Sequence, residues 1–453
     1  MKMLAELLAD REYIKKTLNI AIPVTLNSVM GIITNFIDTM MVGKLGEAAI
    51  AGVGLANKVF FTYTLLVFGI TSGISILVSQ YWGNRDKESI RRVLGIGIVL
   101  AMFAALAFTS AALINPYGLM KMFTNDPDVI YMGVWYLSVV CFSYPLRAII
   151  SVTVSTMRST GVTKPAVVNS AIAIVVNTVL NYVLIFGKFG FPALGVTGAA
   201  IATISAIAIE LLYTLISVRR YHTVIDCKLK DVFSFDLPLL KQFFKTALPV
   251  VLNEFLWGFG TTMYSTVYGR MGESAAAAMT VANTDIEIVA FHGLSTAALV
   301  ILGNELGAGK MDDAERHSKY FLWLGLLVSI FACITTLILK GPFTSLFTIE
   351  ADTGHMVRTI LSVFAFTVFI RAQNDIILVG ILRSGGDTKI CALLDIIGIW
   401  LIGVPLAFIS GLVLDLPIFA VFAATEIEEI VKLVLAHRRY RKKLWLKNLT
   451  EKT

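Results

Sequence analysis

The sequence repeats itself at about half its length. One constant offset aligns the two halves without a gap, in two runs of paired residues. The first run pairs Ala21, Pro23, Val24, Leu26 and Asn27 with Ala247, Pro249, Val250, Leu252 and Asn253; the second pairs Gly43, Gly46, Glu47, Ala49, Ala51, Ala56 and Asn57 with Gly269, Gly272, Glu273, Ala275, Ala277, Ala282 and Asn283. A later motif recurs too, with Arg158, Ser159, Gly161, Thr163 and Lys164 matching Arg383, Ser384, Gly386, Thr388 and Lys389. Internal repeats of this length in an apolar chain are typical of transporters.

Composition indicates that the repeated unit folds in lipid. Of the 453 residues, 57% are hydrophobic and only 15% are charged. A hydrocarbon core about 30 Å thick needs roughly 20 apolar helical residues to cross it. The sequence predicts an all-α membrane protein with twelve transmembrane helices, near residues 17–41, 49–79, 93–114, 130–155, 164–187, 195–218, 246–268, 276–303, 318–339, 357–381, 390–411 and 416–437.

Twelve spans and one repeat predict two six-helix lobes. We expect an N-lobe over 1–218 (helices 1–6), a cytoplasmic linker over 219–245, a C-lobe over 246–437 (helices 7–12) and a basic cytoplasmic tail over 438–453. Because each lobe has six spans, both lobes begin on the same side of the membrane, so an axis along the membrane normal should relate them.

Basic residues predict the orientation. They concentrate on alternate connections, and by the positive-inside rule these connections are cytoplasmic, which places both termini inside a plasma membrane. The net charge of +7 is then explained by topology without nucleic acid. No cleavable signal peptide is recognisable at the N-terminus. The four cysteines have no metal-binding or redox spacing, and we expect no cofactor.

Polar residues lie inside the predicted spans of the N-lobe. Helix one carries Asn27, Gly31, Thr34, Asn35 and Asp38 at helical spacing, which places them on one face. Asn177 and Asn181 lie one turn apart on helix five, and Thr203 lies on helix six. Unsatisfied polar groups in hydrocarbon cost several kcal/mol, so this face should look into protein or a wet cavity. For Asn27 and Thr34, simple helix-to-helix hydrogen bonding is an alternative to function.

The C-lobe carries a different polar set. Asn253 and Glu254 lie on helix seven, Asp285 on helix eight and Asp375 on helix ten, while Pro23 and Pro249 should kink the repeat-related helices one and seven. Each acid left charged in lipid would cost roughly 3 kcal/mol. The intramembrane acids must therefore be paired, protonated, cation-bound or exposed to water. Arg371 and Asp375 are four residues apart, and mutual neutralisation is an alternative for them.

At these residues the chain resembles the multidrug and toxic compound extrusion (MATE) family, and more closely a group of such exporters common in Gram-positive bacteria. The repeated proline helices, the two Arg-Ser-x-Gly-x-Thr-Lys motifs and the run from Gly195 to Thr203 carry the resemblance over nearly the whole chain. The family implies two lobes around a central V-shaped cavity, with export of organic cations and hydrophobic drugs in exchange for inward Na+ or H+.

The resemblance also implies roles for residues. Asp38, Asn177, Asn181 and Thr203 match the family's first-lobe cation site, although relatives usually have an acid where Asn181 stands. Asn253, Glu254, Asp375 and Asp285 are the candidates for a second-lobe cation or substrate site, although relatives place the helix-seven Glu where this chain has Trp257. Residues expected to line the cavity, where flexible apolar and aromatic side chains suit varied cations, are Asn27, Met40, Phe60, Trp257, Met263 and Tyr264.

A flippase and a membrane enzyme are the alternatives to an antiporter. A lipid-linked saccharide flippase shares this architecture, but a diphosphate head group favours several unpaired basic residues inside the spans, where acids prevail here. A membrane enzyme would need a nucleophile, a metal site or a phosphate loop, and no such motif is recognisable. We therefore expect a monomeric, non-enzymatic antiporter that binds small organic cations or hydrophobic drugs, coupled to Na+ or H+.

Overall fold

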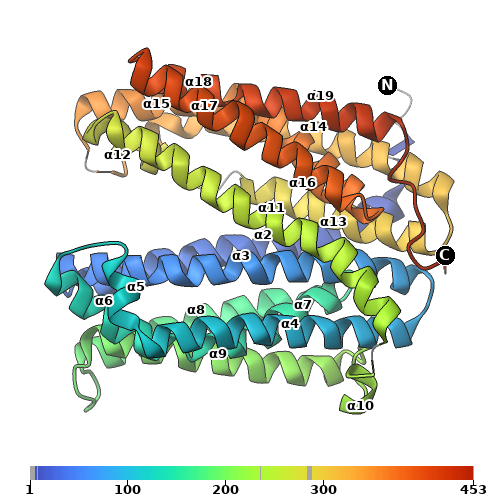
Figure 1. Cartoon of the computed structure of the whole chain (residues 1–453), viewed down its shortest axis with the longest axis horizontal. Helices are drawn as coiled ribbons and strands as arrows, with labels where there is room; N and C mark the ends of the chain where they lie inside the picture. Colours follow the sequence, from blue (N-terminus) through green and yellow to red (C-terminus); the bar gives the residue numbers. More distant parts are fainter. Residues whose placement is uncertain (1–5, 8, 235, 283–287, 348, 452–453) are drawn as a thin grey trace. The chain divides into compact units, whose positions relative to one another are not determined.

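A computed structural model describes residues 6–451 of the chain, apart from residues 8, 235, 283–287 and 348. The described residues are helical with connecting turns and contain no β-strand (Figure 1). The first half contains α2 (Arg11–Gly43), α3 (Glu47–Gly83), α4 (Lys87–Ile114), α5 (Pro116–Lys121), α6 (Pro127–Val140), α7 (Ser143–Ser159), α8 (Lys164–Phe186), α9 (Gly195–Arg220) and α10 (Leu229–Val232). The second half contains α11 (Leu237–Arg270), α12 (Glu273–Ala282), α13 (Ile288–Gly307), α14 (Met311–Thr344), α15 (Ala351–Asp375), η1 (Ile376–Leu382), α16 (Thr388–Ile396), η2 (Ile397–Gly403), α17 (Val404–Phe408), η3 (Ile409–Val413), α18 (Ile418–Thr425) and α19 (Ile427–Arg441).

The predicted spans fall on these helices. Within the described part of the chain, eight helices are long and apolar enough to cross a membrane, or nine if α6 and α7, bent by 53° at their break, form one span. The remaining predicted spans fall on α11, on α12 with α13, and on α18 with α19. The segments η1, η2 and η3 are π-helical turns that continue α15, α16 and α17. Such turns insert extra residues into a helix and were not predicted from the sequence.

The described chain forms two compact units. The C-unit comprises Met1–Ile22, Ser79–Arg85 and Leu252–Thr453, and the N-unit comprises Pro23–Val78 and Asp86–Val251. Helices α2, α3 and α11 therefore contribute residues to both units. In α2 the division falls directly before Pro23, and in α11 it falls two residues after Pro249.

In the N-unit, α9 is the central packing element. It contacts α8, α7 and α6, while α7 also packs against α4. The connection that follows α9 packs on α4: the Nε of Arg91 donates to the carbonyl oxygen of Val224 at 2.9 Å, and Arg92 pairs with Asp236 at 3.6 Å. These contacts lie in the stretch predicted to be the linker between the lobes, residues 219–245, and attach it to α4.

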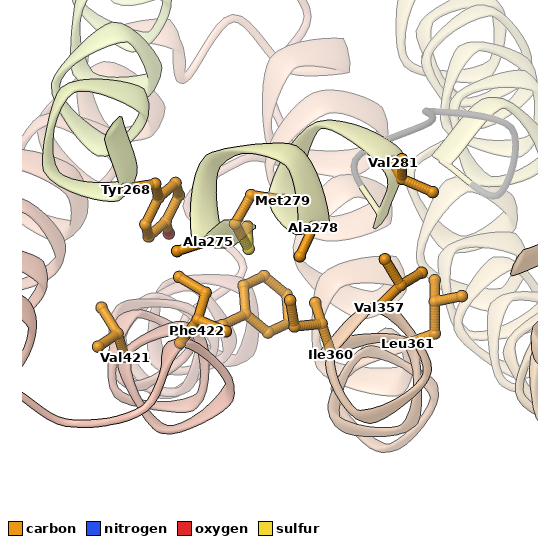
Figure 2. Close-up of a cluster of buried hydrophobic side chains, with 11 residues drawn as sticks. Tyr268, Ala275, Ala278, Met279, Val281, Val357, Ile360, Leu361, Val421 and Phe422 are labelled. Atoms are coloured by element: carbon orange, nitrogen blue, oxygen red, sulfur yellow. The ribbon is translucent and has the colours of Figure 1, made fainter. Parts of the chain in front are cut away.

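In the C-unit, α12, α15 and α18 enclose a core of aromatic and aliphatic side chains (Figure 2). Val357, Ile360 and Leu361 recur on one face of α15 at the spacing of a buried helical stripe. Phe422 of α18 and Met279 of α12 pack against that face. A neighbouring apolar cluster joins α13, α14 and the middle of α15.

The sequence repeat is also a repeat of backbone conformation. Gly46 and Gly272, which the offset pairs, have φ angles of 112° and 123° and each directly precedes a helix. Gly161 and Gly386 of the two Arg-Ser-x-Gly-x-Thr-Lys motifs have φ angles of 87° and 76°. Side chains with a Cβ rarely adopt this left-handed region, which accounts for glycine at both copies of each turn.

The ends of α3 and α13 cross within the C-unit at close range. A Cβ on Gly83 would overlap the backbone of Asn304, and a Cβ on Gly307 would overlap the backbone of Gln80. Gln80 also joins this crossing to the chain's C-terminal segment: its Nε2 donates to the carbonyl oxygen of Lys447 at 3.1 Å, and its Oε1 accepts from the amide of Leu449 at 2.6 Å.

Candidate functional site

The N-unit brings together the four side chains predicted for its cation site. Asp38 extends from α2, Asn177 and Asn181 from α8, and Thr203 from α9. The Nδ2 of Asn181 donates to Asp38 Oδ1 at 2.6 Å and to Asn177 Oδ1 at 3.0 Å. The Nδ2 of Asn177 donates to Thr203 Oγ1 at 3.4 Å. Three helices thus place a carboxylate, two amides and a hydroxyl in one connected set.

Both amides of this set are shielded from solvent, while Asp38 and Thr203 are partly exposed. Asn177 and Asn181 are only 3% and 1% exposed. Asn181 Oδ1 is buried and accepts no hydrogen bond from the described residues. A buried acceptor without a donor costs about 1–3 kcal/mol, so a bound cation would compensate that loss. The residues present therefore fit a monovalent cation.

A tyrosine that the sequence did not single out completes the surroundings. Tyr136 of α6 is buried, and its phenol lies near both Asp38 and Thr203. No repeat or spacing pattern pointed to it, because it is one aromatic residue in an apolar helix. Its position indicates that α6 contributes to the same site.

The polar face of α2 continues away from Asp38. Ser170 Oγ of α8 donates a hydrogen bond to Asn27 Oδ1 of α2. Helices α2 and α8 therefore have polar contacts both at Asn27 and at Asp38. Thr34 Oγ1 donates to the carbonyl oxygen of Met30 at 2.9 Å, within its own helix. Asn27 therefore makes the helix-to-helix hydrogen bond that was the structural alternative to a transport role. Thr34 instead bonds within its own helix.

The acidic side chains that the structure describes at the predicted C-unit site bind different partners on other helices. Glu254 of α11 forms an ion pair with Arg383 at 3.1 Å, and the Arg383 side chain is only 2% exposed. Asn253 Nδ2 donates to Asp395 Oδ2 of α16 at 2.9 Å. The helix-seven pair Asn253 and Glu254 thus contacts two different partners. The sequence offered no basis for pairing Glu254 with Arg383, a residue at the edge of a predicted cytoplasmic turn.

A second charge cluster of the C-unit centres on Lys432 of α19. Its ammonium lies 2.6 Å from Glu429, 3.7 Å from Glu428 and 3.8 Å from Asp395. Tyr264 donates its hydroxyl hydrogen to Glu428 Oε2 at 2.7 Å. Asp395 is one of the intramembrane acids recognised in the sequence, but Glu428, Glu429 and Lys432 were missed. The i, i+4 spacing of Glu428 and Lys432 inside a predicted span was an available signal.

The other acids predicted for the C-unit site are Asp375 and Asp285. Asp375 accepts a hydrogen bond from Ser295 Oγ of α13. Arg371, four residues earlier, forms a bidentate ion pair with Glu426 and not with Asp375. Asp285 lies outside the described residues.

Glu254, Asp375 and Asp395 thus each have a partner among the described residues. A buried amide oxygen without a hydrogen-bond donor among the described residues occurs in both units, at Asn181 and at Asn253.

The family comparison agrees with this repeated architecture. The MatE family model matches residues 23–183 and again residues 249–409, with the same offset that pairs Pro23 with Pro249. The chain belongs to the MatE family.

Relatives of this MatE protein match along most of their length. It is 26% identical to the "Uncharacterized transporter YisQ" of Bacillus subtilis (strain 168), over 90% of each chain. It is 25% identical to the "Probable multidrug resistance protein YoeA" of the same organism, over 93% of this chain and 92% of the relative.

Solved structures support the fold. An outward-facing multidrug resistance MATE family transporter of the MOP superfamily superimposes with a TM-score of 0.85 at 20% identity, covering 94% of this chain and 96% of that one. A MOP superfamily transporter from Pyrococcus furiosus, described as having a binding pocket of reversed polarity, gives a TM-score of 0.86 at 20% identity over 95% of each chain. The prediction of an all-α, twelve-helix membrane fold is confirmed.

The remaining predicted residues of this MatE protein occupy both units. Met40 is exposed on α2, and Phe60 of α3 lies beside the rings of Tyr63 and Tyr144. In the C-unit, Trp257 is exposed and Met263 is half-buried on α11, and Tyr264 is bound to Glu428 as described. That these side chains line one central cavity stays a prediction, as do the kinks at Pro23 and Pro249, which both lie inside continuous helices.

Proposed function

We propose that this MatE-family protein is a secondary active antiporter that exports organic cations and hydrophobic drugs in exchange for inward Na+ or H+. The relatives named multidrug resistance proteins support the substrate class. The observation that carries the coupling proposal is the hydrogen-bonded set of Asp38, Asn177, Asn181 and Thr203, in which both amides are buried. One carboxylate with three neutral oxygen donors suits one positive charge.

In this proposal the coupling cation binds beside Asp38. The Asn181 amide nitrogen now lies against the carboxylate at 2.6 Å. Turning that amide would present its unsatisfied Oδ1 to a cation bound between Asp38 and Asn181. Binding would neutralise the net negative charge of the set, and release on the cytoplasmic side would restore the hydrogen bond seen here.

The energetics are adequate for drug export. Inward movement of one positive charge yields about 2.3 kcal/mol per 100 mV of membrane potential. Because 1.4 kcal/mol is tenfold in concentration, one charge supports a substrate gradient of several tens-fold. Helices α2 and α11, shared between the units and each containing a proline near the division, are the elements that we expect to bend during the cycle.

The test is transport by the purified protein in vesicles. Ethidium movement is followed under an imposed Na+ gradient, an imposed pH gradient, or neither. Movement that requires either ion gradient supports the antiporter and identifies its ion. Movement that is equally fast without a gradient would contradict coupling, and the absence of movement under every gradient would favour the flippase.

A further inference from the structure

The C-unit contains a cavity of about 890 Å³ that the proposed transport cycle does not use. Helix α14, the junction of α15 with η1, helix α19 and the segment that follows α19 all contribute lining side chains. All lining residues belong to the C-unit, whereas Asp38 and its partners belong to the N-unit. The cavity is therefore a separate site.

One side of this cavity is strongly basic. Lys319, Arg438, Arg441 and Lys443 line it, with Glu315 as the only acidic lining residue. Glu315 is already occupied, because its two oxygens bind Lys319 at 3.1 Å and Lys443 at 2.6 Å. Arg438 and Arg441 are exposed and have no ion pair with any described residue. Two guanidinium groups three residues apart on α19 thus lack a counter-charge.

The other walls are apolar and aromatic. Leu322, Trp323 and Leu326 of α14 and Val434 of α19 contribute apolar lining side chains. Trp445, fully buried, stacks on Tyr440 with ring centroids 6.1 Å apart. The indole N–H of Trp445 has no acceptor among the described residues. The cavity therefore places unpaired cations next to an apolar surface.

This combination matches the chemistry of a membrane lipid with a negative head group. Guanidinium groups bind phosphate through paired hydrogen bonds, and basic pockets between helices on the cytoplasmic side recognise anionic head groups. The positive-inside rule places this end of α14 and α19 on the cytoplasmic side, where anionic lipids concentrate. A soluble phosphate would gain nothing from the apolar walls.

We propose that this cavity binds one anionic phospholipid of the cytoplasmic leaflet. Arg438 and Arg441 hold the phosphate, and an acyl chain lies along Leu322, Leu326 and Val434. The site does not depend on which ion or drug the protein transports, so its test measures lipid binding and not export.

The experiment titrates the purified full-length protein in neutral detergent with phosphatidylglycerol and counts bound lipids by native mass spectrometry. Phosphatidylcholine and inorganic phosphate are titrated in parallel. The test variant is Arg438→Gln with Arg441→Gln. The matched control is Arg219→Gln with Arg220→Gln, which removes two exposed arginines from the last turn of α9, outside the cavity.

We expect the wild type and the control to bind one phosphatidylglycerol tightly, with no comparable binding of phosphatidylcholine. Each arginine should contribute about fivefold, so the test variant should bind roughly 30-fold more weakly. Should that double variant fail to fold, each single substitution is expected to weaken binding about fivefold. Equal loss in the test and control variants would overturn the site, and binding of inorganic phosphate as tight as that of phosphatidylglycerol would overturn the lipid as its ligand.

Discussion

At the residue scale, the amide of Asn181 determines whether the N-unit site is suited to a metal cation or to a proton. The site contains one carboxylate, and an amide can ligate a cation through its oxygen but cannot hold a transferable proton. The spacing of Asn177 and Asn181 predicted that both side chains share one helix face. Their contact with Asp38 followed from the family resemblance, and the 2.6 Å hydrogen bond now gives it a geometry.

Replacing Asn181 by Asp should shift coupling toward protons. Two adjacent carboxylates cannot both ionise easily, so the pair would bind one proton tightly. We expect Asn181→Asp to raise the rate of pH-driven dye export relative to the Na+-driven rate, measured as a ratio of initial rates in vesicles. The control is Asn115→Asp at the N-cap of α5, outside the spans, where Asp caps as well as Asn does. An unchanged ratio in Asn181→Asp would contradict the role of this position.

The ion pair of Glu254 makes a different prediction. Breaking a buried ion pair by removing one partner costs about 3–5 kcal/mol. We expect Glu254→Gln to lower the free energy of unfolding by roughly that amount, because Arg383 is only 2% exposed. The control is Glu88→Gln, whose pair with Arg92 is solvent-exposed and worth less than about 1 kcal/mol. Chemical denaturation in detergent measures both, and equal losses would show that the Glu254 pair is not structurally important.

At the element scale, the crossing of α3 and α13 depends on glycine. Overpacking a close helix contact costs about 1–3 kcal/mol, and a Cβ on Gly307 would meet the backbone of Gln80. We expect Gly307→Ala to destabilise the protein by at least that amount. Gly31→Ala in α2 is the control, since no atom beyond its chain neighbours and its own helix backbone lies within 4 Å of the added Cβ. This substitution should be neutral or stabilising by up to about 1 kcal/mol. Thermal unfolding compares them; a stable Gly307→Ala variant would contradict the crossing.

The sequence predicted secondary-structure elements where a local residue pattern specifies them. The apolar runs predicted the helices, and the offset paired Gly46 with Gly272, which the structure places in equivalent turns. The π-helical turns after Asp375 and Ile396 were not predictable, because an inserted residue leaves no mark in apolar periodicity. The pairing of Glu254 with Arg383 depends on how helices far apart in sequence pack, and no local pattern specifies that.

At the scale of the whole molecule, orientation in the membrane is the feature that still rests on charge alone. Cys227 lies in the connection between α9 and α10, which the basic residues assign to the cytoplasm, and the other three cysteines are buried. Cys227 is therefore a natural reporter of sidedness.

We expect a membrane-impermeant thiol reagent to label wild-type protein only from the cytoplasmic side and to leave Cys227→Ser unlabelled. Burial raises the pKa of the Cys227 thiol above its ordinary value, although the Arg91 charge opposes this. Because the thiolate reacts, labelling should be slow at neutral pH and accelerate as the pH rises toward that raised pKa. Labelling from the outside would invert the predicted topology.

The central claim concerns Asp38 and is tested most directly by ion-driven ethidium export in vesicles containing Asp38→Asn. The control, Asp126→Asn, makes the same change at the exposed N-cap of α6, where Asn preserves the cap. We expect Asp38→Asn to fold normally and to lose nearly all export driven by the coupling ion, while Asp126→Asn exports like the wild type. Export by Asp38→Asn that equals the wild type under both Na+ and pH gradients would contradict the account.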